Sequence, residues 1–285
     1  MATAVYRHYD QAALDAQYNN RAKVPDFQER HIARWIEGGV RARAQFTTHE
    51  QIVYDPSSGE RLNLFLPAGQ GPWPVLIYIH GGYWMALDKS STDCVALGLV
   101  PHGVAVVNID YTLMPAVRMD EVVRQCRAAV QWVHVQAALY GLDAARVWVA
   151  GHSAGGHLTA AVAAHGWAGR PPLAGGFAFS GLHDLEPIRC CYLNQTLRLD
   201  EPEAARNSPV HLQPPADGDW TLHVGGLEGE EYLRQSVALA QAWASTPSRR
   251  MALEVCAGAD HFSLVAPLED PRSALVSRML QTIRA

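Results

Sequence analysis

The stretch that most constrains the fold is residues 147–158, where an apolar segment runs into a glycine-rich turn and then into small residues. Four apolar residues precede the sequence Gly-His-Ser-Ala-Gly at 151–155, and mainly glycine, alanine and leucine follow it. Glycines two residues on either side of Ser153 allow a sharp reversal, because side chains there would collide. The pattern predicts a strand, a tight turn and a helix, with Ser153 at the apex.

The same pattern predicts that Ser153 is a nucleophile, because this turn exposes its hydroxyl in a strained backbone conformation. The alternative is a loop serine at a tight turn, without chemistry. A serine hydroxyl attacks poorly at neutral pH, so the chain must also supply a base, an acid to orient that base, and donors for an oxyanion.

Candidate oxyanion donors follow the apolar run 75–79, in the sequence His-Gly-Gly-Tyr-Trp. Glycines let a loop approach a reacting carbonyl without a Cβ atom in the way. We expect the main-chain N–H groups of Gly81, Gly82 and Ala154 to form an oxyanion hole. Tyr83 and Trp84 are either ordinary core aromatics or one wall of a substrate pocket.

The base and the acid are expected downstream, in the order serine, acid, histidine. His261 lies just after the last predicted strand, where the base is expected. Glu228 is the first carboxylate after the preceding strand and its Gly-Gly turn, and it is our choice for the acid. The competing carboxylates are Glu230 and Glu231, which resemble the acidic first turn of the next helix, Asp260, which adjoins the base, and Asp184.

Strand-like and helix-like segments alternate along the chain, which predicts an α/β fold with a mostly parallel, doubly wound sheet of about eight strands and helices on both faces. We expect one domain over 1–285, with an N-terminal arm over 1–50 and a proline-rich cap or lid insertion over 184–215. The predicted strands are 62–66, 75–80, 104–110, 147–150, 173–179, 220–224 and 251–255, and the predicted helices are 115–140, 231–243 and 272–283.

Composition excludes several classes of function. The net charge of -5 is spread without a basic stripe, so we expect no nucleic-acid partner. No window has the roughly 20 apolar residues of a membrane span, and residues 1–20 lack a signal-peptide core, which favours a cytoplasmic location. The five cysteines and 13 histidines show no metal-ligand spacing, so neither a metal nor a cofactor is expected. The oligomeric state stays open, a homodimer included.

At these residues the chain resembles the serine-hydrolase type of arylformamidase, the kynurenine formamidase family of α/β-hydrolases. That family carries an HGGxW oxyanion motif, matched by residues 80–84, and a GHSAG turn, matched by 151–155. The resemblance extends to the arm at 18–25 and to the segments 110–115, 180–187 and 231–236.

The resemblance implies Ser153 as nucleophile, His261 as base, Glu228 as acid, and an acyl-enzyme formed by cleavage of a formyl group from an aryl formamide. The alternative is a short-chain carboxylesterase, and a non-catalytic binding protein is a remote third interpretation. Departures from the family pattern are Glu228 in place of aspartate, His183 in place of an aromatic residue, and Tyr232 in place of phenylalanine. Substrate contacts are expected from Tyr83, Trp84, His152, His183, Asn194 and Tyr18.

Overall fold

A computed structural model describes residues 3–164, 167 and 173–285, and its centre is one eight-stranded sheet with the order β1-β2-β4-β3-β5-β6-β7-β8. The six strands from β3 to β8 pair in parallel, while β2 pairs antiparallel with both β1 and β4. This arrangement confirms the predicted mostly parallel α/β sheet. The strands are Thr47–Asp55 (β1), Glu60–Leu66 (β2), Trp73–Ile79 (β3), Ala105–Ile109 (β4), Leu142–His152 (β5), Gly175–Phe179 (β6), Gly218–Gly225 (β7) and Arg249–Cys256 (β8).

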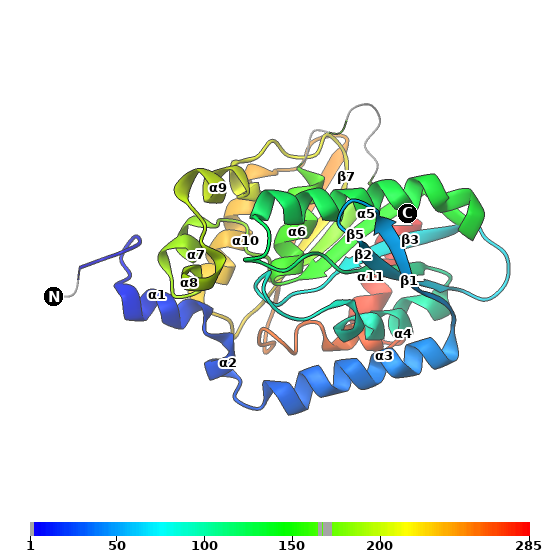
Figure 1. Cartoon of the computed structure of the whole chain (residues 1–285), viewed down its shortest axis with the longest axis horizontal. Helices are drawn as coiled ribbons and strands as arrows, with labels where there is room; N and C mark the ends of the chain where they lie inside the picture. Colours follow the sequence, from blue (N-terminus) through cyan, green and yellow to red (C-terminus); the bar gives the residue numbers. More distant parts are fainter. Residues whose placement is uncertain (1–2, 165–166, 168–172) are drawn as a thin grey trace.

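Helices cover both faces of the sheet (Figure 1). One face packs against α5, α6 and α10, and the other packs against α3, α4 and α11. The helices are Gln11–Tyr18 (α1), Asn20–Lys23 (α2), Ala33–Gln45 (α3), Ala96–Leu99 (α4), Met119–Tyr140 (α5), Ala154–Ala163 (α6), Glu186–Cys190 (α7), Asn194–Leu197 (α8), Glu201–Arg206 (α9), Glu230–Ala242 (α10) and Ala274–Arg284 (α11).

Side-chain alternation on the central strands divides the core into two layers. On β3, Val75 and Ile77 face the layer that contains α5 and α6, whereas Leu76 and Tyr78 face the layer that contains α3 and α11. All four residues are buried, as expected for a parallel strand covered on both faces. The carboxyl ends of these strands therefore meet at one edge of a rigid, fully packed sheet.

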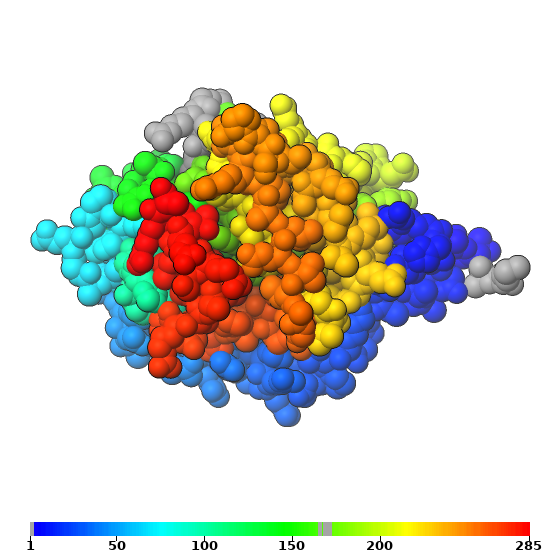
Figure 2. Space-filling view, turned by 180° about the vertical axis from the view of Figure 1, so that it is seen from behind, coloured from blue at the N-terminus to red at the C-terminus, as the bar shows by residue number. Residues whose placement is uncertain are grey.

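The N-terminal arm has more structure than the sequence indicated. Residues 11–45 form three helices and a π-helical turn at Gln28–Ile32, and β1 extends the sheet by an antiparallel edge. In the space-filling view the arm, in blue, lies beside the segment that leads into α10 (Figure 2). The hydroxyl of Tyr18 donates to Glu231, so the arm is bonded to that helix.

The segment 184–215 consists of the short helices α7, α8 and α9 and a 3₁₀ turn at Pro209–His211. Its α9 is bound to the start of α5, because Glu203 accepts a hydrogen bond from the main-chain nitrogen of Met119 at 2.8 Å and pairs with Arg118. Arg206 pairs with Asp120 at 2.6 Å. Among the residues that the structure describes, no helix is long and apolar enough to cross a membrane.

Candidate active site

Ser153 occupies the sharp turn between β5 and α6. Its backbone angles, φ 57° and ψ −117°, lie in a region that L-residues rarely adopt. A Cβ atom on Gly155 would overlap the carbonyl oxygen of Ile79, and one on Gly151 would overlap the backbone of Gly155. Ser153 donates its main-chain N–H to Phe179 at 2.8 Å, which fixes the turn to β6. The strain is therefore held by close packing on both sides of the serine.

The loop after β3 passes directly over this turn. A Cβ atom on Gly81 would lie 3.4 Å from the Cβ of Ser153, so the main chain of Gly81 lies against the serine. Three consecutive residues, Gly82, Tyr83 and Trp84, have positive φ values of 102°, 51° and 58°. The hydroxyl of Tyr111 donates to the carbonyl of His80 at 3.2 Å. This strained loop brings the main chain of Gly81 beside the serine side chain.

His261 and Glu228 form a buried pair. Oε2 of Glu228 lies 2.6 Å from Nδ1 of His261, and both side chains are almost fully buried. The other oxygen, Oε1, accepts the N–H of Gly225 at 2.7 Å and the hydroxyl of Ser180. Because the carboxylate is held on both oxygens, it orients the imidazole with Nδ1–H toward Glu228, so in the neutral ring Nε2 is the nitrogen without a hydrogen.

The carboxylates that competed with Glu228 have other partners. Glu231 pairs with Arg234 at 2.8 Å, and Asp184 pairs with the same guanidinium at 2.9 Å. Glu230 accepts a hydrogen bond from the hydroxyl of Tyr9 at 3.2 Å. Asp260 accepts the main-chain N–H of Phe262 and of Ser263, which caps the turn that carries His261.

Ser153 and His261 line one cavity, which is partly open to solvent. Gly81, Gly82, Tyr83 and His152 also line it. The remaining lining is largely apolar or aromatic and comes from the arm, from the segment after Trp84 and from the loop after His261: Phe27, Ile32, Trp35, Tyr78, Leu87, Cys94, Val95, Phe262 and Val265, with Asn20, Arg21, Gln28, Ser91 and Thr92. Such a pocket suits a small substrate with an aryl group.

The other predicted substrate contacts lie outside this lining. Trp84 is fully buried and donates its indole N–H to Nδ1 of His157 at 3.1 Å. His183 is fully buried beside Gly181, and Asn194 holds both main-chain groups of Leu199. Tyr18 is buried, and its carbonyl oxygen accepts the hydroxyl of Tyr83 at 2.6 Å. Tyr18 therefore supports a lining residue from behind.

Sequence reasoning missed the arm's share of the cavity. Phe27 directly precedes the π-helical turn, Ile32 ends it and Trp35 lies at the start of α3. The ring of Phe27 stacks on Phe262 at 5.0 Å beside the candidate base. The cue in the sequence was the aromatic residues of an otherwise polar arm. Nothing local in the sequence indicates that this segment packs beside the loop that carries His261 and Phe262.

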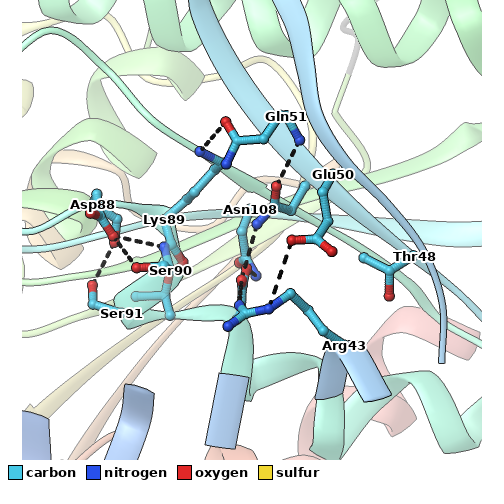
Figure 3. Close-up of polar contacts among 12 residues, drawn as sticks. Arg43, Thr48, Glu50, Gln51, Asp88, Lys89, Ser90, Ser91 and Asn108 are labelled. Carbon is cyan, nitrogen blue, oxygen red and sulfur yellow. Dashed lines mark hydrogen bonds and ion pairs between the residues drawn. The ribbon is translucent and has the colours of Figure 1, made fainter. Parts of the chain in front are cut away.

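A polar network holds the segment that follows Leu87 (Figure 3). Asp93 is fully buried and accepts hydrogen bonds from Arg43 of α3 at 2.5 Å and from Asn108 of β4 at 2.9 Å. Lys89 pairs with Asp110 at 2.5 Å. Because Ser91 and Thr92 line the cavity, this network positions one of the cavity walls. Within the described part of the chain, no cluster of three or more His, Cys, Asp or Glu side chains has the geometry of a metal site.

Comparison with known proteins identifies related hydrolases. The BD-FAE family model matches residues 62–168. The chain is 31% identical to a kynurenine formamidase of Salmo salar, over 93% of this chain and 92% of that protein. It is similar to the crystal structure of a candidate thioesterase from Silicibacter sp., with 32% identity, a TM-score of 0.77, and coverage of 95% and 99% of the two chains. An esterase of Pyrobaculum calidifontis shares the fold, with 17% identity, a TM-score of 0.70, and coverage of 94% and 93%.

Proposed function

The chain belongs to the kynurenine formamidase family of α/β-hydrolases, and on that basis we propose that it removes a formyl group from an aryl formamide through an acyl-enzyme on Ser153. The observation that carries the proposal is the contact of 2.6 Å between Glu228 and the ring of His261, which lines one cavity with Ser153. A nucleophile on a strained turn, a base and an oriented acid are the groups that acyl transfer requires.

In the proposed reaction, His261 takes the hydroxyl proton as Oγ of Ser153 attacks the formyl carbon. The oxyanion that develops is held by the main-chain N–H groups of Gly81, Gly82 and Ala154. The carbon–nitrogen bond then breaks, and His261 returns the proton to the departing nitrogen to give an arylamine. Water, activated by the same imidazole, hydrolyses the formyl ester and releases formate. Glu228 stabilises the charged imidazolium in both halves of the reaction.

The cavity supports a small acyl group and an aromatic leaving group. The main chain of Gly81 lies directly against Ser153, which leaves little space on the acyl side. Phe27, Trp35 and Phe262 offer aromatic surface on the arm side. A flat leaving group stacks well on such surface, and an aniline departs more readily than an alkylamine.

The second candidate is a carboxylesterase that uses the same three side chains, a function favoured by the esterases that share the fold. The similarity to an enzyme over most of the chain argues against the third interpretation, a non-catalytic binding protein. The cytoplasmic location stays a prediction from the sequence, and the oligomeric state, a homodimer included, stays open.

The deciding experiment compares turnover of N-formylkynurenine, N-formylanthranilate and 4-nitrophenyl acetate by the purified chain. We expect at least one formamide to have the highest kcat/KM. A strong preference for the acetate over both formamides would replace the formamidase proposal with the esterase.

A further inference from the structure

Asn20 is the arm residue most deeply enclosed at the active site. It is 3% exposed, and it lines the main cavity. Its side-chain nitrogen Nδ2 lies 3.0 Å from the hydroxyl of Tyr83 and 2.7 Å from the hydroxyl of Tyr232. These two hydroxyls lie 2.8 Å apart, so the three side chains form a closed polar triangle.

The protons in this triangle fix which way the amide points. The hydroxyl of Tyr83 donates to the carbonyl oxygen of Tyr18 at 2.6 Å, which uses its only proton. The contact between the two hydroxyls then requires Tyr232 to donate to Tyr83, which uses the proton of Tyr232. Neither hydroxyl has a proton left for Asn20, so the amide must present its two N–H groups to both of them.

This orientation leaves the carbonyl oxygen of Asn20 without a partner. Oδ1 is buried and accepts no hydrogen bond from any described residue. Buried amide oxygens are almost always paired in folded proteins. Asn20 lines the cavity, so a ligand N–H that bonds to this oxygen gives it the partner that the protein does not supply.

Asn20 also lies beside the candidate base. A second, more polar cavity borders Glu228 and Asp260, and the residues that line both cavities are Asn20 and His261. The ring of Tyr232, which Asn20 holds, is centred 4.9 Å from the ring of His261. Asn20 therefore lies on the same side of the main cavity as His261, the candidate base.

We propose that Asn20 Oδ1 accepts the N–H of the scissile amide and so selects formamides over esters. This inference rests on the proposed function and identifies the feature of the substrate that the site recognises. When Oγ of Ser153 bonds to the formyl carbon, the nitrogen becomes pyramidal. A hydrogen bond from its N–H to Asn20 turns the lone pair toward His261, which then delivers the proton as the carbon–nitrogen bond breaks. An ester oxygen has no hydrogen to offer and gains nothing from this acceptor.

The test compares formanilide with phenyl formate. The two compounds share the formyl group and the phenyl ring, but formanilide has an N–H group where phenyl formate has an oxygen atom. We expect Asn20→Leu, which keeps the shape and removes the acceptor, to lower kcat/KM for formanilide about tenfold. For phenyl formate we expect a change of less than about threefold. Asn20→Ala is the second variant, in case leucine is not accommodated, and thermal melting reports whether each variant is folded.

Tyr18→Phe is the matched control. It removes a buried hydroxyl from the same arm, and this hydroxyl bonds to Glu231 and Gln235. Tyr18 does not line the cavity. We expect it to change both substrates equally. If the folded Asn20 variants lower both substrates by the same factor, Asn20 has only a structural role and the inference is overturned. If the unaltered chain cleaves phenyl formate but not formanilide, the formamidase proposal itself fails and this inference fails with it.

Discussion

Nε2 of His152 lies 2.7 Å from the main-chain carbonyl oxygen of His261, so the residue just before the candidate nucleophile holds the backbone of the candidate base. A carbonyl only accepts, so His152 must donate from Nε2. Burial holds the pKa of His152 well below its usual range, which keeps the ring neutral beside the ring of His261. This contact ties the turn after β5 to the loop after β8 and sets the position of the imidazole relative to Ser153.

His152→Phe is therefore expected to lower kcat about tenfold, because the loop that carries His261 loses its anchor. His152→Gln, which keeps a donor near the same place, is expected to retain more activity than the phenylalanine variant. The measurement is steady-state turnover at neutral pH. Equal activity of both variants and the unaltered chain would show that this contact does not position the base.

Ser153→Ala is expected to abolish acylation while the fold is kept, because alanine occupies the strained turn with nearly the same volume. Stoichiometric labelling by a fluorophosphonate, followed by intact mass, should occur in the unaltered chain and vanish in the variant. Labelling of the alanine variant at the same rate would place the nucleophile elsewhere.

Glu228→Gln is expected to lower kcat by two to four orders of magnitude, because an amide does not stabilise the imidazolium or fix its tautomer. Glu230→Gln is the matched control, since that carboxylate lies two residues away and bonds to Tyr9. Turnover of the preferred substrate measures both. An equal effect of the two substitutions would remove Glu228 from the proposed role.

Gly81→Val is expected to lower kcat about 10²- to 10³-fold by displacing the main-chain N–H groups from the developing oxyanion. A Cβ atom at this position would lie 2.9 Å from the carbonyl oxygen of His152, so the loop must shift. Gly103→Ala is a control for backbone strain alone, because Gly103 has a φ of 80° and a Cβ atom there meets no neighbour. A folded Gly81→Val variant with unchanged kcat would argue against this oxyanion hole.

His183→Phe is expected to reduce the loss of stability in acid. Both ring nitrogens of His183 are buried without a hydrogen-bond partner among the described residues, and burial, with a smaller effect of His157, lowers its pKa to about 3. In the unfolded chain the pKa of a histidine is near 6.5, so between about pH 6.5 and pH 3 the unfolded chain binds more protons than the folded one. The free energy of unfolding therefore falls as pH falls through this range. At pH 5 the variant should therefore lose about 2 kcal/mol less of its free energy of unfolding than the unaltered chain loses.

The measurement for His183→Phe is the free energy of unfolding by urea at pH 7.5 and at pH 5. We expect the difference between the two pH values to be smaller in the variant than in the unaltered chain. An unchanged difference would mean that His183 does not titrate on unfolding in this range.

The local pattern around Ser153 was sufficient to predict the strand, the turn and the helix, because glycine spacing and apolar runs act over a few residues. Chain order was sufficient to choose His261 and Glu228, because parallel strands bring their carboxyl ends to one edge. The helical arm and the edge strand β1 were missed. Most residues of α3 and β1 are half-exposed or exposed, so these segments are polar overall.

By itself the sequence determined the class of fold and which hydroxyl, imidazole and carboxylate stand at the ends of its strands, since these follow from short-range pattern and topology. Only the tertiary structure decided which side chains surround them. The arm that carries Asn20 and Trp35 reaches the cavity through long-range packing and buried hydroxyl contacts. Such contacts depend on the distance between atoms in space, and no spacing along the chain encodes that distance.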